Sequence, residues 1–299
     1  MEFALRGAPG DSRLALGLGS ARRRAERSRE TLEGYAAQSQ IDLINYRLVG
    51  ASDIYAVEAV ADSVRAFQKS FTSAADFLEH GPKAKAKYSN EIERKTRLNF
   101  AYTYPGSLGI VFAVENQRDL YADGDFDPII DVFSQFLNVS DETEAIDASR
   151  HMGAALIGQL CWWVDVNAKW DTSIDLVVKR PGGLQRGQFV SKNRFIDLHD
   201  IFHSAVDSEP STFEVSGMLV GLDIEPGSFH FVVPGGEDYR GGLADDFVKQ
   251  KRTVPDRYVA TIHEDVKRVV ATGKETRTLK LKHLEPIPRE QKGEPVSQE

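Results

Sequence analysis

The sequence predicts an α+β protein, with a mixed helix and strand region over residues 1–207 and a small β-barrel over residues 208–287. Two observations support this prediction. In the first region, segments with apolar side chains at helical spacing alternate with short runs of strand character. After Glu209-Pro210, five short strand-like runs are separated by glycine and proline turns, which is typical of an SH3-like or OB-like barrel.

Caps and periodicity define the elements of the first region. Ser52 is expected to cap a helix in which apolar residues recur at helical spacing as far as Phe77. Asp141 and Glu144 have capping-box spacing ahead of a long apolar helix, which we expect to lie across the core. The expected helices cover 20–37, 53–80, 127–137, 145–166 and 193–206, and the expected strands cover 41–48, 97–104, 108–115, 173–178 and 188–190.

The turns show how neighbouring strands connect. Tyr104-Pro105-Gly106-Ser107 fits a type II turn, because proline presets φ at the first central position and glycine accepts a positive φ at the second. The strands over 97–104 and 108–115 should therefore form a hairpin. In the barrel, the expected strands cover 213–224, 228–233, 239–243, 258–262 and 276–284. The tail over 288–299 is mostly polar and is expected to be disordered.

The composition argues against several classes of protein. The 299 residues carry a net charge of −8, which disfavours attraction of the whole surface to nucleic acid or to anionic lipid. Cys161 is the only cysteine, so we expect no intramolecular disulfide and no cysteine-based zinc site. No apolar stretch reaches the ~20 residues that span a bilayer, and the N-terminal residues lack a secretion signal. We therefore expect a cytoplasmic protein without membrane contact.

One motif has the spacing of metal ligands. His199, Asp200 and His203 form an H-D-x-x-H pattern within a predicted helix, where positions i and i+4 share a face and both imidazoles could bind one divalent metal ion. The pattern resembles the zincin motif, with the shorter Asp200 in the place of the general base. A third ligand is not specified, and Asp207, His151, His230 and His263 are the candidates. The pattern also fits a helix whose histidines flank an apolar face.

Two groups of basic residues are candidates for contact with nucleic acid or with a protein partner. Arg22, Arg23 and Arg24 open an arginine-rich helix, but interleaved glutamates favour a solvated or partner-facing surface. Lys280 and Lys282 share one face of the last predicted strand. A row of lysines could follow a phosphate backbone, and it could equally protect an exposed strand edge.

Two stretches of hairpin chemistry are similar to those of uncharacterised bacterial proteins that join an N-terminal α+β region to a small C-terminal β-barrel. They are Tyr104-Pro-Gly-Ser-Leu-Gly-Ile-Val-Phe-Ala-Val114, and Val215-Ser-Gly-Met-Leu-Val-Gly-Leu-Asp-Ile224 followed by Gly227-Ser-Phe-His-Phe231. The resemblance implies a fold and a bacterial or phage setting. It implies no activity, no cofactor and no functional residue.

The leading functional hypothesis is a non-catalytic binding or adaptor subunit of a bacterial cytoplasmic assembly, such as a defence or stress system, with a protein partner or further copies of itself. Catalytic spacing such as G-x-S-x-G is absent, while the stretch from Asp119 to Asp147 carries nine acidic residues and no Lys or Arg. Two alternatives stay open. One is a metal-dependent hydrolase that uses the H-D-x-x-H helix, and the other is a nucleic-acid-binding protein that uses the barrel. The sequence does not decide whether the protein is an enzyme.

Overall fold

The computed structural model of the chain describes residues 26–36, 38–39, 41–50, 55–104, 108–115, 127–180, 185–247 and 252–288. The chain divides into two compact units. The first comprises Met1–Ala205 with Val270–Gly273, and the second comprises Val206–Val269 with Lys274–Glu299. The fold is α+β, as expected, and no helix among the described residues is long and apolar enough to cross a membrane.

A five-stranded antiparallel sheet forms the base of the first unit. Its strand order is β2-β3-β1-β4-β5, so β2 and β5 are the edges. Each of these strands pairs antiparallel with its neighbours. The strands are β1 (Ile41–Val49), β2 (Asn99–Tyr104), β3 (Leu108–Glu115), β4 (Ser173–Lys179) and β5 (Gln185–Val190). The expected hairpin of β2 and β3 is present, and its turn at 105–107 lies outside the described residues.

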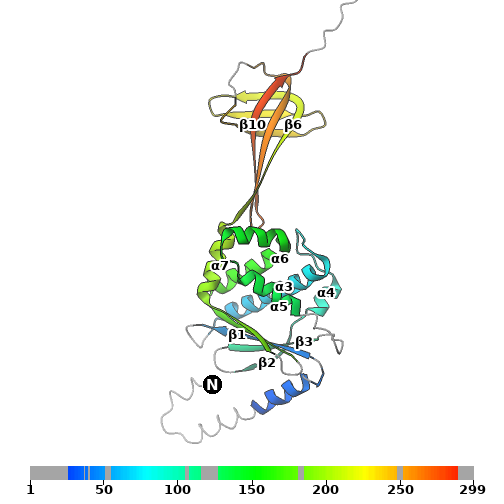
Figure 1. The fold of residues 1–299 in the computed structure, drawn as a ribbon, viewed down its shortest axis with the longest axis vertical. Coiled ribbons are helices and arrows are strands. Elements are labelled where there is room, and N and C mark those ends of the chain that lie inside the picture. Colours follow the sequence, from blue (N-terminus) through cyan, green and yellow to red (C-terminus); the bar gives the residue numbers. More distant parts are fainter. Residues whose placement is uncertain are drawn as a thin grey trace, which may run out of the picture. The chain divides into compact units, whose positions relative to one another are not determined.

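Helices cover one face of this sheet (Figure 1). They are α3 (Val57–His80), α5 (Asp127–Leu137), α6 (Glu142–Lys169) and α7 (Lys192–Ser204), with the short α4 (Asn90–Lys95) beside them. Alternate residues of β1, namely Ile44, Tyr46 and Leu48, point into the core with the apolar faces of these helices. The capping box is confirmed, since Asp141 accepts a hydrogen bond from the Glu144 backbone N–H at 2.9 Å.

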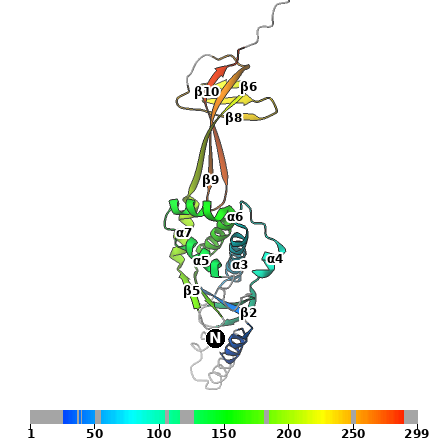
Figure 2. The ribbon, with the colours of Figure 1, turned by 45° about the vertical axis from the view of Figure 1, so that its right-hand side comes forward.

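A further helix, over residues 26–36, contacts the opposite face of the sheet (Figure 2). Ala36 is buried there against Leu43 and Val111. Glu33 accepts a hydrogen bond from the Tyr102 hydroxyl at 2.9 Å and lies 3.3 Å from the Lys179 amine. The helix has few apolar residues to bury, and these polar contacts help to anchor it on the sheet.

A β-bulge at Ala101 explains how Tyr102 reaches that opposite face. Phe100 pairs with Phe112, which faces the helices, whereas Tyr102 pairs with Val111, which faces the other way. In a regular strand, residues two apart share a face, so the extra residue at Ala101 reverses the orientation of Tyr102. Tyr102 can therefore bond Glu33, while Phe100 stays on the helix side.

The long core helix predicted from the sequence is interrupted. Gly153 has φ 82° and ψ 153°, so α6 consists of two helical segments joined at a non-helical residue. The backbone of Lys83 fills the break, and its carbonyl oxygen accepts the Ala155 N–H at 2.9 Å. The Lys83 side chain contacts the buried Asp76 carboxylate at 2.7 Å, so the segment after α3 is fixed to both helices.

A closed circuit of hydrogen bonds lies in the middle of the core. Trp163 Nε1 donates to the Tyr46 hydroxyl at 2.9 Å, and Tyr46 and Ser63 share a hydrogen bond of 2.7 Å. Ser63 Oγ donates to Asn167 Oδ1 at 2.8 Å, and Asn167 Nδ2 donates to the Trp163 carbonyl at 2.7 Å. Because Ser63 has one proton and gives it to Asn167, Tyr46 must be the donor to Ser63. The circuit joins β1, α3 and α6.

The second unit is a closed barrel with strand order β10-β8-β7-β6-β9, in which the pairing of β9 with β10 completes the ring. Its strands are β6 (Val206–Asp223), β7 (Ser228–Val232), β8 (Asp238–Leu243), β9 (Asp256–Val269) and β10 (Glu275–Pro286). Closure requires a glycine at position 241, since a Cβ there would lie 2.2 Å from the Leu279 carbonyl oxygen. Phe229, Phe231 and Ile262 are among the buried residues inside.

Two strands of this unit are longer than the sequence indicated. β6 begins at Val206, which was expected to end the preceding helix, and β9 continues to Val269. Residues 206–219 pair with 269–256 along a continuous antiparallel ladder. The stretch was misread because its side chains are polar and exposed over most of 208–212, so they lack the alternation of a half-buried strand.

We expect Gly153→Ala to lower the free energy of unfolding by at least about 2 kcal/mol, because alanine resists a positive φ and its Cβ would lie 2.7 Å from Lys83 N. Gly158, five residues later in α6, is the matched control: a Cβ there meets nothing within 4 Å, so Gly158→Ala should gain roughly 0.5–1 kcal/mol. Thermal unfolding followed by circular dichroism measures both. Equal effects would contradict the assigned break.

We expect stability to fall in alkali partly through Tyr46. Burial raises the pKa of Tyr46 to about 12, whereas an unfolded tyrosine titrates near pH 10. Between these values the folded state keeps the Tyr46 proton, whereas the unfolded state has lost it. The free energy of unfolding should therefore fall by about 2–3 kcal/mol as the pH rises from about 10 toward 12. Urea unfolding across this range should show a shallower decline for Tyr46→Phe. At neutral pH the free energy of unfolding of Tyr46→Phe should be lower than that of the wild type by about 1–3 kcal/mol, because Trp163 Nε1 loses its acceptor.

Candidate metal centre

The helix α7 presents both predicted histidines at its surface. Ser191 caps it by accepting the Arg194 N–H at 3.1 Å, and Phe195, Leu198 and Phe202 are buried along one face. His199 and His203 flank that face with 41% and 32% of their side-chain surfaces exposed. Their ring centroids are 4.2 Å apart, as the i, i+4 spacing requires.

A carboxylate from α6 lies between the two imidazoles. Asp165 Oδ1 is 2.8 Å from His199 Nδ1 and 3.1 Å from His203 Nε2, and Asp165 Oδ2 is 3.2 Å from His203 Nε2. In this arrangement each imidazole N–H donates to the carboxylate, which fixes the tautomer of a neutral ring. Asp165 thus holds both rings with these nitrogens facing one point.

The three side chains fit a divalent transition-metal ion. One ligand atom from each lies within 4.8 Å of the others. A tetrahedral ion with ligands at about 2.0–2.2 Å separates its ligand atoms by roughly 3.3–3.6 Å, so small side-chain adjustments would complete the geometry. To bind the ion through these nitrogens, each neutral imidazole would have to carry its proton on the other ring nitrogen, which is Nε2 of His199 and Nδ1 of His203. Two imidazoles and one carboxylate suit Zn²⁺, Fe²⁺, Co²⁺ or Ni²⁺.

Sequence reasoning missed Asp165 as the third ligand. Asp207 is buried elsewhere, and His151 packs against Phe77. His230 lies beside Asp238, and His263 contacts Thr212, both within the second unit. The available signal was a carboxylate within the apolar run Cys161-Trp-Trp-Val-Asp-Val166, since a charged residue in such a run usually has a specific partner.

Two further sequence candidates do not join this cluster. Asp200, expected as a general base, is exposed and is not part of the cluster. Cys161 is 2% exposed, and burial together with the nearby Asp165 charge raises the pKa of its thiol, so the thiolate is disfavoured at neutral pH.

The predicted basic contacts are described only in part. Arg22, Arg23 and Arg24 lie outside the described residues, whereas Arg29 in the described helix over 26–36 pairs with Glu33 at 3.8 Å. Lys280 and Lys282 are exposed on β10, while the alternating Leu279 and Leu281 face the barrel interior.

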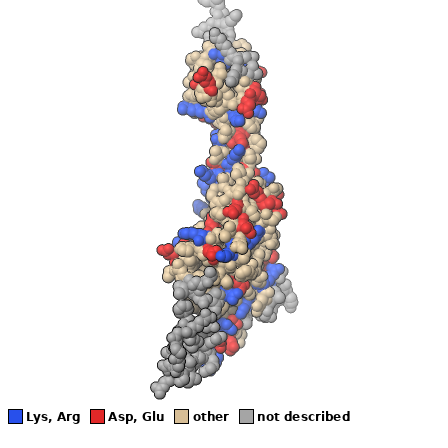
Figure 3. Space-filling view, turned by 90° about the vertical axis from the view of Figure 1, so that its left-hand side faces the viewer, with Lys and Arg blue, Asp and Glu red and all other residues tan. Residues whose placement is uncertain are grey.

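The surroundings of these lysines are mixed in charge. Lys267 pairs with Asp265, and Arg268 pairs with Glu275. On the face drawn in Figure 3, Lys and Arg alternate with Asp and Glu and do not gather into a patch of one sign. Among the described residues of the barrel no Phe, Tyr or Trp side chain is exposed, and the exposed aromatic ring beside these lysines is the imidazole of His283. Contact with nucleic acid stays a prediction.

Comparison with protein-family models, with curated proteins and with solved structures finds no match for this chain.

Proposed function

We propose that this chain is a metal-binding protein in which Asp165, His199 and His203 hold one divalent transition-metal ion, and that the ion acts as a non-catalytic clasp between α6 and α7 of a binding or adaptor protein. The observation that carries the proposal is the convergence of one carboxylate and two imidazoles from two helices. A cation at this point would replace the hydrogen bonds between the Asp165 carboxylate and the two imidazoles with three direct metal–ligand bonds.

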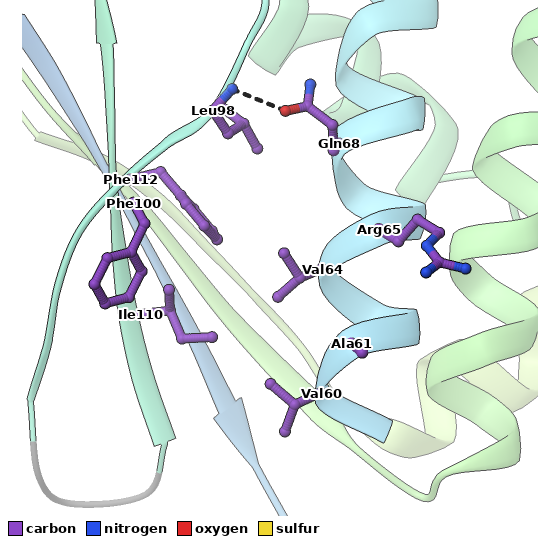
Figure 4. A pocket seen from close by; sticks show the side chains of 9 residues that line it. All are labelled: Val60, Ala61, Val64, Arg65, Gln68, Leu98, Phe100, Ile110 and Phe112. Atoms are coloured by element: carbon purple, nitrogen blue, oxygen red, sulfur yellow. Dashed lines mark hydrogen bonds between the residues drawn. The ribbon is translucent and has the colours of Figure 1, made fainter. Parts of the chain in front are cut away.

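Two observations favour a clasp over a catalyst. The two recesses described in the first unit are lined by α3 with β2 and β3 (Figure 4), and by α5 with β4 and β5, so neither includes the three ligands. Asp200, the expected general base, is exposed and outside the cluster. The three ligand side chains are 32–41% exposed, so water would compete with a substrate for polar contacts at the ion.

Hydrolysis is the second candidate, and one observation favours it. Three protein ligands leave a coordination position for water, which is the pattern of catalytic zinc sites, and 32–41% of the side-chain surface of each ligand is exposed. In that case zinc-loaded protein should hydrolyse a phosphodiester or a peptide, and Asp165→Asn should abolish the activity.

The role of the whole protein as a binding or adaptor subunit is also a proposal. The barrel of β6–β10 is of a size common among binding modules, and its likeness to SH3-like or OB-like barrels stays a prediction. A protein partner, a second copy, a cytoplasmic location and a bacterial defence or stress system are likewise predictions from the sequence. The nucleic-acid alternative would require binding that weakens steeply with salt and with Lys280→Glu and Lys282→Glu together.

We expect the purified protein to bind close to one equivalent of Zn²⁺ or Co²⁺ in equilibrium dialysis, and His199→Ala, His203→Ala and Asp165→Asn each to lose it. Zinc at a hundredfold excess over its dissociation constant should stabilise the wild type by about 2.7 kcal/mol. For a unit of this size the melting temperature should rise by roughly 5–10 °C.

Asp200→Asn is the matched control, because it removes a carboxylate from the same helix outside the cluster, and it should bind zinc as the wild type does. Zinc binding that survives Asp165→Asn, or that is lost in Asp200→Asn alone, would overturn the assigned ligand set. If the wild type binds no zinc and no cobalt, the three residues only hold α6 and α7 together by hydrogen bonds.

A further inference from the structure

The end of α7 is closed by a segment that lies far away in the sequence. The last carbonyl groups of a helix have no partner within the helix and must bond elsewhere. In α7 the Phe202 carbonyl accepts the Ala271 N–H at 3.1 Å, and the carbonyl of the C-cap residue Ala205 accepts the Val270 N–H at 3.0 Å. The turn over residues 270–273 therefore caps the C-terminal end of α7.

This capping turn belongs to the first unit, although it lies between two strands of the second. The chain leaves the first unit after Ala205 and returns to it over Val270–Gly273, between β9 and β10. Val270 and Ala271 are buried there in the same apolar cluster as Phe202. The returning chain is therefore bonded to α7 beside the residue at which the outgoing chain leaves it.

His203, one of the three proposed metal ligands, shares a peptide group with an acceptor of the capping turn. The carbonyl of Phe202 and the N–H of His203 belong to one planar peptide unit, so the acceptor of the Ala271 hydrogen bond moves together with the His203 backbone. His199 lies one helical turn earlier, and Asp165 of α6 bonds both imidazoles. An ion bound to all three side chains would therefore hold the last turn of α7 against α6.

The end of α7 and the capping turn should open together when no ion is bound. Segments of a native protein open locally with free energies that range from near zero at frayed ends to the global value in the core. Ser204 and Thr272, which follow the bonded groups in the two segments, are exposed, so this region lies at the margin of the core. Opening the last turn of α7 withdraws the Phe202 and Ala205 carbonyls from the capping turn, which then loses both hydrogen bonds.

We propose that the metal ion regulates how firmly α7 holds the capping turn: with the ion bound, the end of α7 and the turn over 270–273 stay closed, and without it they open together. The inference rests on the proposed function, because it needs an ion on Asp165, His199 and His203. An ion that binds only the closed state lowers the population of the open state by the factor 1 + [ion]/Kd. That factor is about a hundredfold at an ion concentration of about a hundred times Kd.

The test is native-state amide hydrogen exchange of the full chain, measured by NMR without zinc and with zinc at about a hundred times its Kd. An amide exchanges while its hydrogen bond is open, so its rate reports the population of the open state. Zinc should slow exchange of the Val270 and Ala271 amides at least about tenfold. The Gly81 amide is the matched control, because it closes the end of α3 by donating to the Phe77 carbonyl at 2.7 Å and α3 carries no ligand. Its rate should change less than about twofold.

Two variants assign the slowing to the ion. Asp165→Asn lacks one ligand, so zinc should leave its Val270 and Ala271 amides unchanged. Asp200→Asn keeps all three ligands and should show the slowing of the wild type. Trypsin provides a second readout, because Lys274 directly follows the capping turn and is exposed. Zinc should slow cleavage after Lys274 in the wild type and in Asp200→Asn, and it should not do so in Asp165→Asn.

Equilibrium dialysis separates failure of this inference from failure of the metal centre. If zinc binds but slows neither the Val270 nor the Ala271 amide, the ion holds α6 and α7 together without affecting the capping turn, and the inference is wrong. If zinc slows the Gly81 amide to the same extent, it stabilises the whole unit, and the inference is wrong as well. If the wild type binds no zinc in dialysis, the metal centre and the inference fail together.

Discussion

Four buried polar side chains from β1, α3 and α6 bond one another in a closed circuit, and the arrangement of the first unit depends on it. Tyr46, Ser63, Trp163 and Asn167 are almost completely buried, so each must find its partner inside the protein or leave a polar group unsatisfied at a cost of about 1–3 kcal/mol. Apolar packing alone tolerates small shifts of one helix against another. A circuit in which every donor has one acceptor does not, and it fixes the register of α6 on α3 and on the sheet.

The register of α6 in turn places Asp165. The helix restarts after Gly153, and Lys83 holds that break through its backbone and through the buried carboxylate of Asp76. Asp165 lies between Trp163 and Asn167 in sequence, so the circuit fixes the segment that carries it. On the other side, Arg194 of α7 donates to the Leu137 carbonyl at 2.8 Å and so ties α7 to the end of α5. The proposed metal ligands thus belong to two independently fixed helices, which is the second-layer support that a metal site needs.

The metal centre relies on polar side chains that converge at a helix surface, whereas the edge of the sheet is shaped by a change of register in β2. The bulge at Ala101 connects the edge to the rest of the fold, because it lets Tyr102 bond Glu33 on one face while Phe100 remains on the other.

Local patterns determined much of this protein. The spacing of Asp141 and Glu144 predicted the start of α6, and the proline and glycine after Tyr104 predicted the hairpin of β2 and β3. These succeed because caps, turns and helical periodicity are interactions between residues close in sequence. The i, i+4 spacing of His199 and His203 is of the same kind. The sequence could not select Asp165, which is 34 residues from His199 and meets it only where α6 packs against α7. The break at Gly153 and the reversal of Tyr102 were likewise decided by the tertiary structure, since each depends on which distant backbone or helix lies beside the residue.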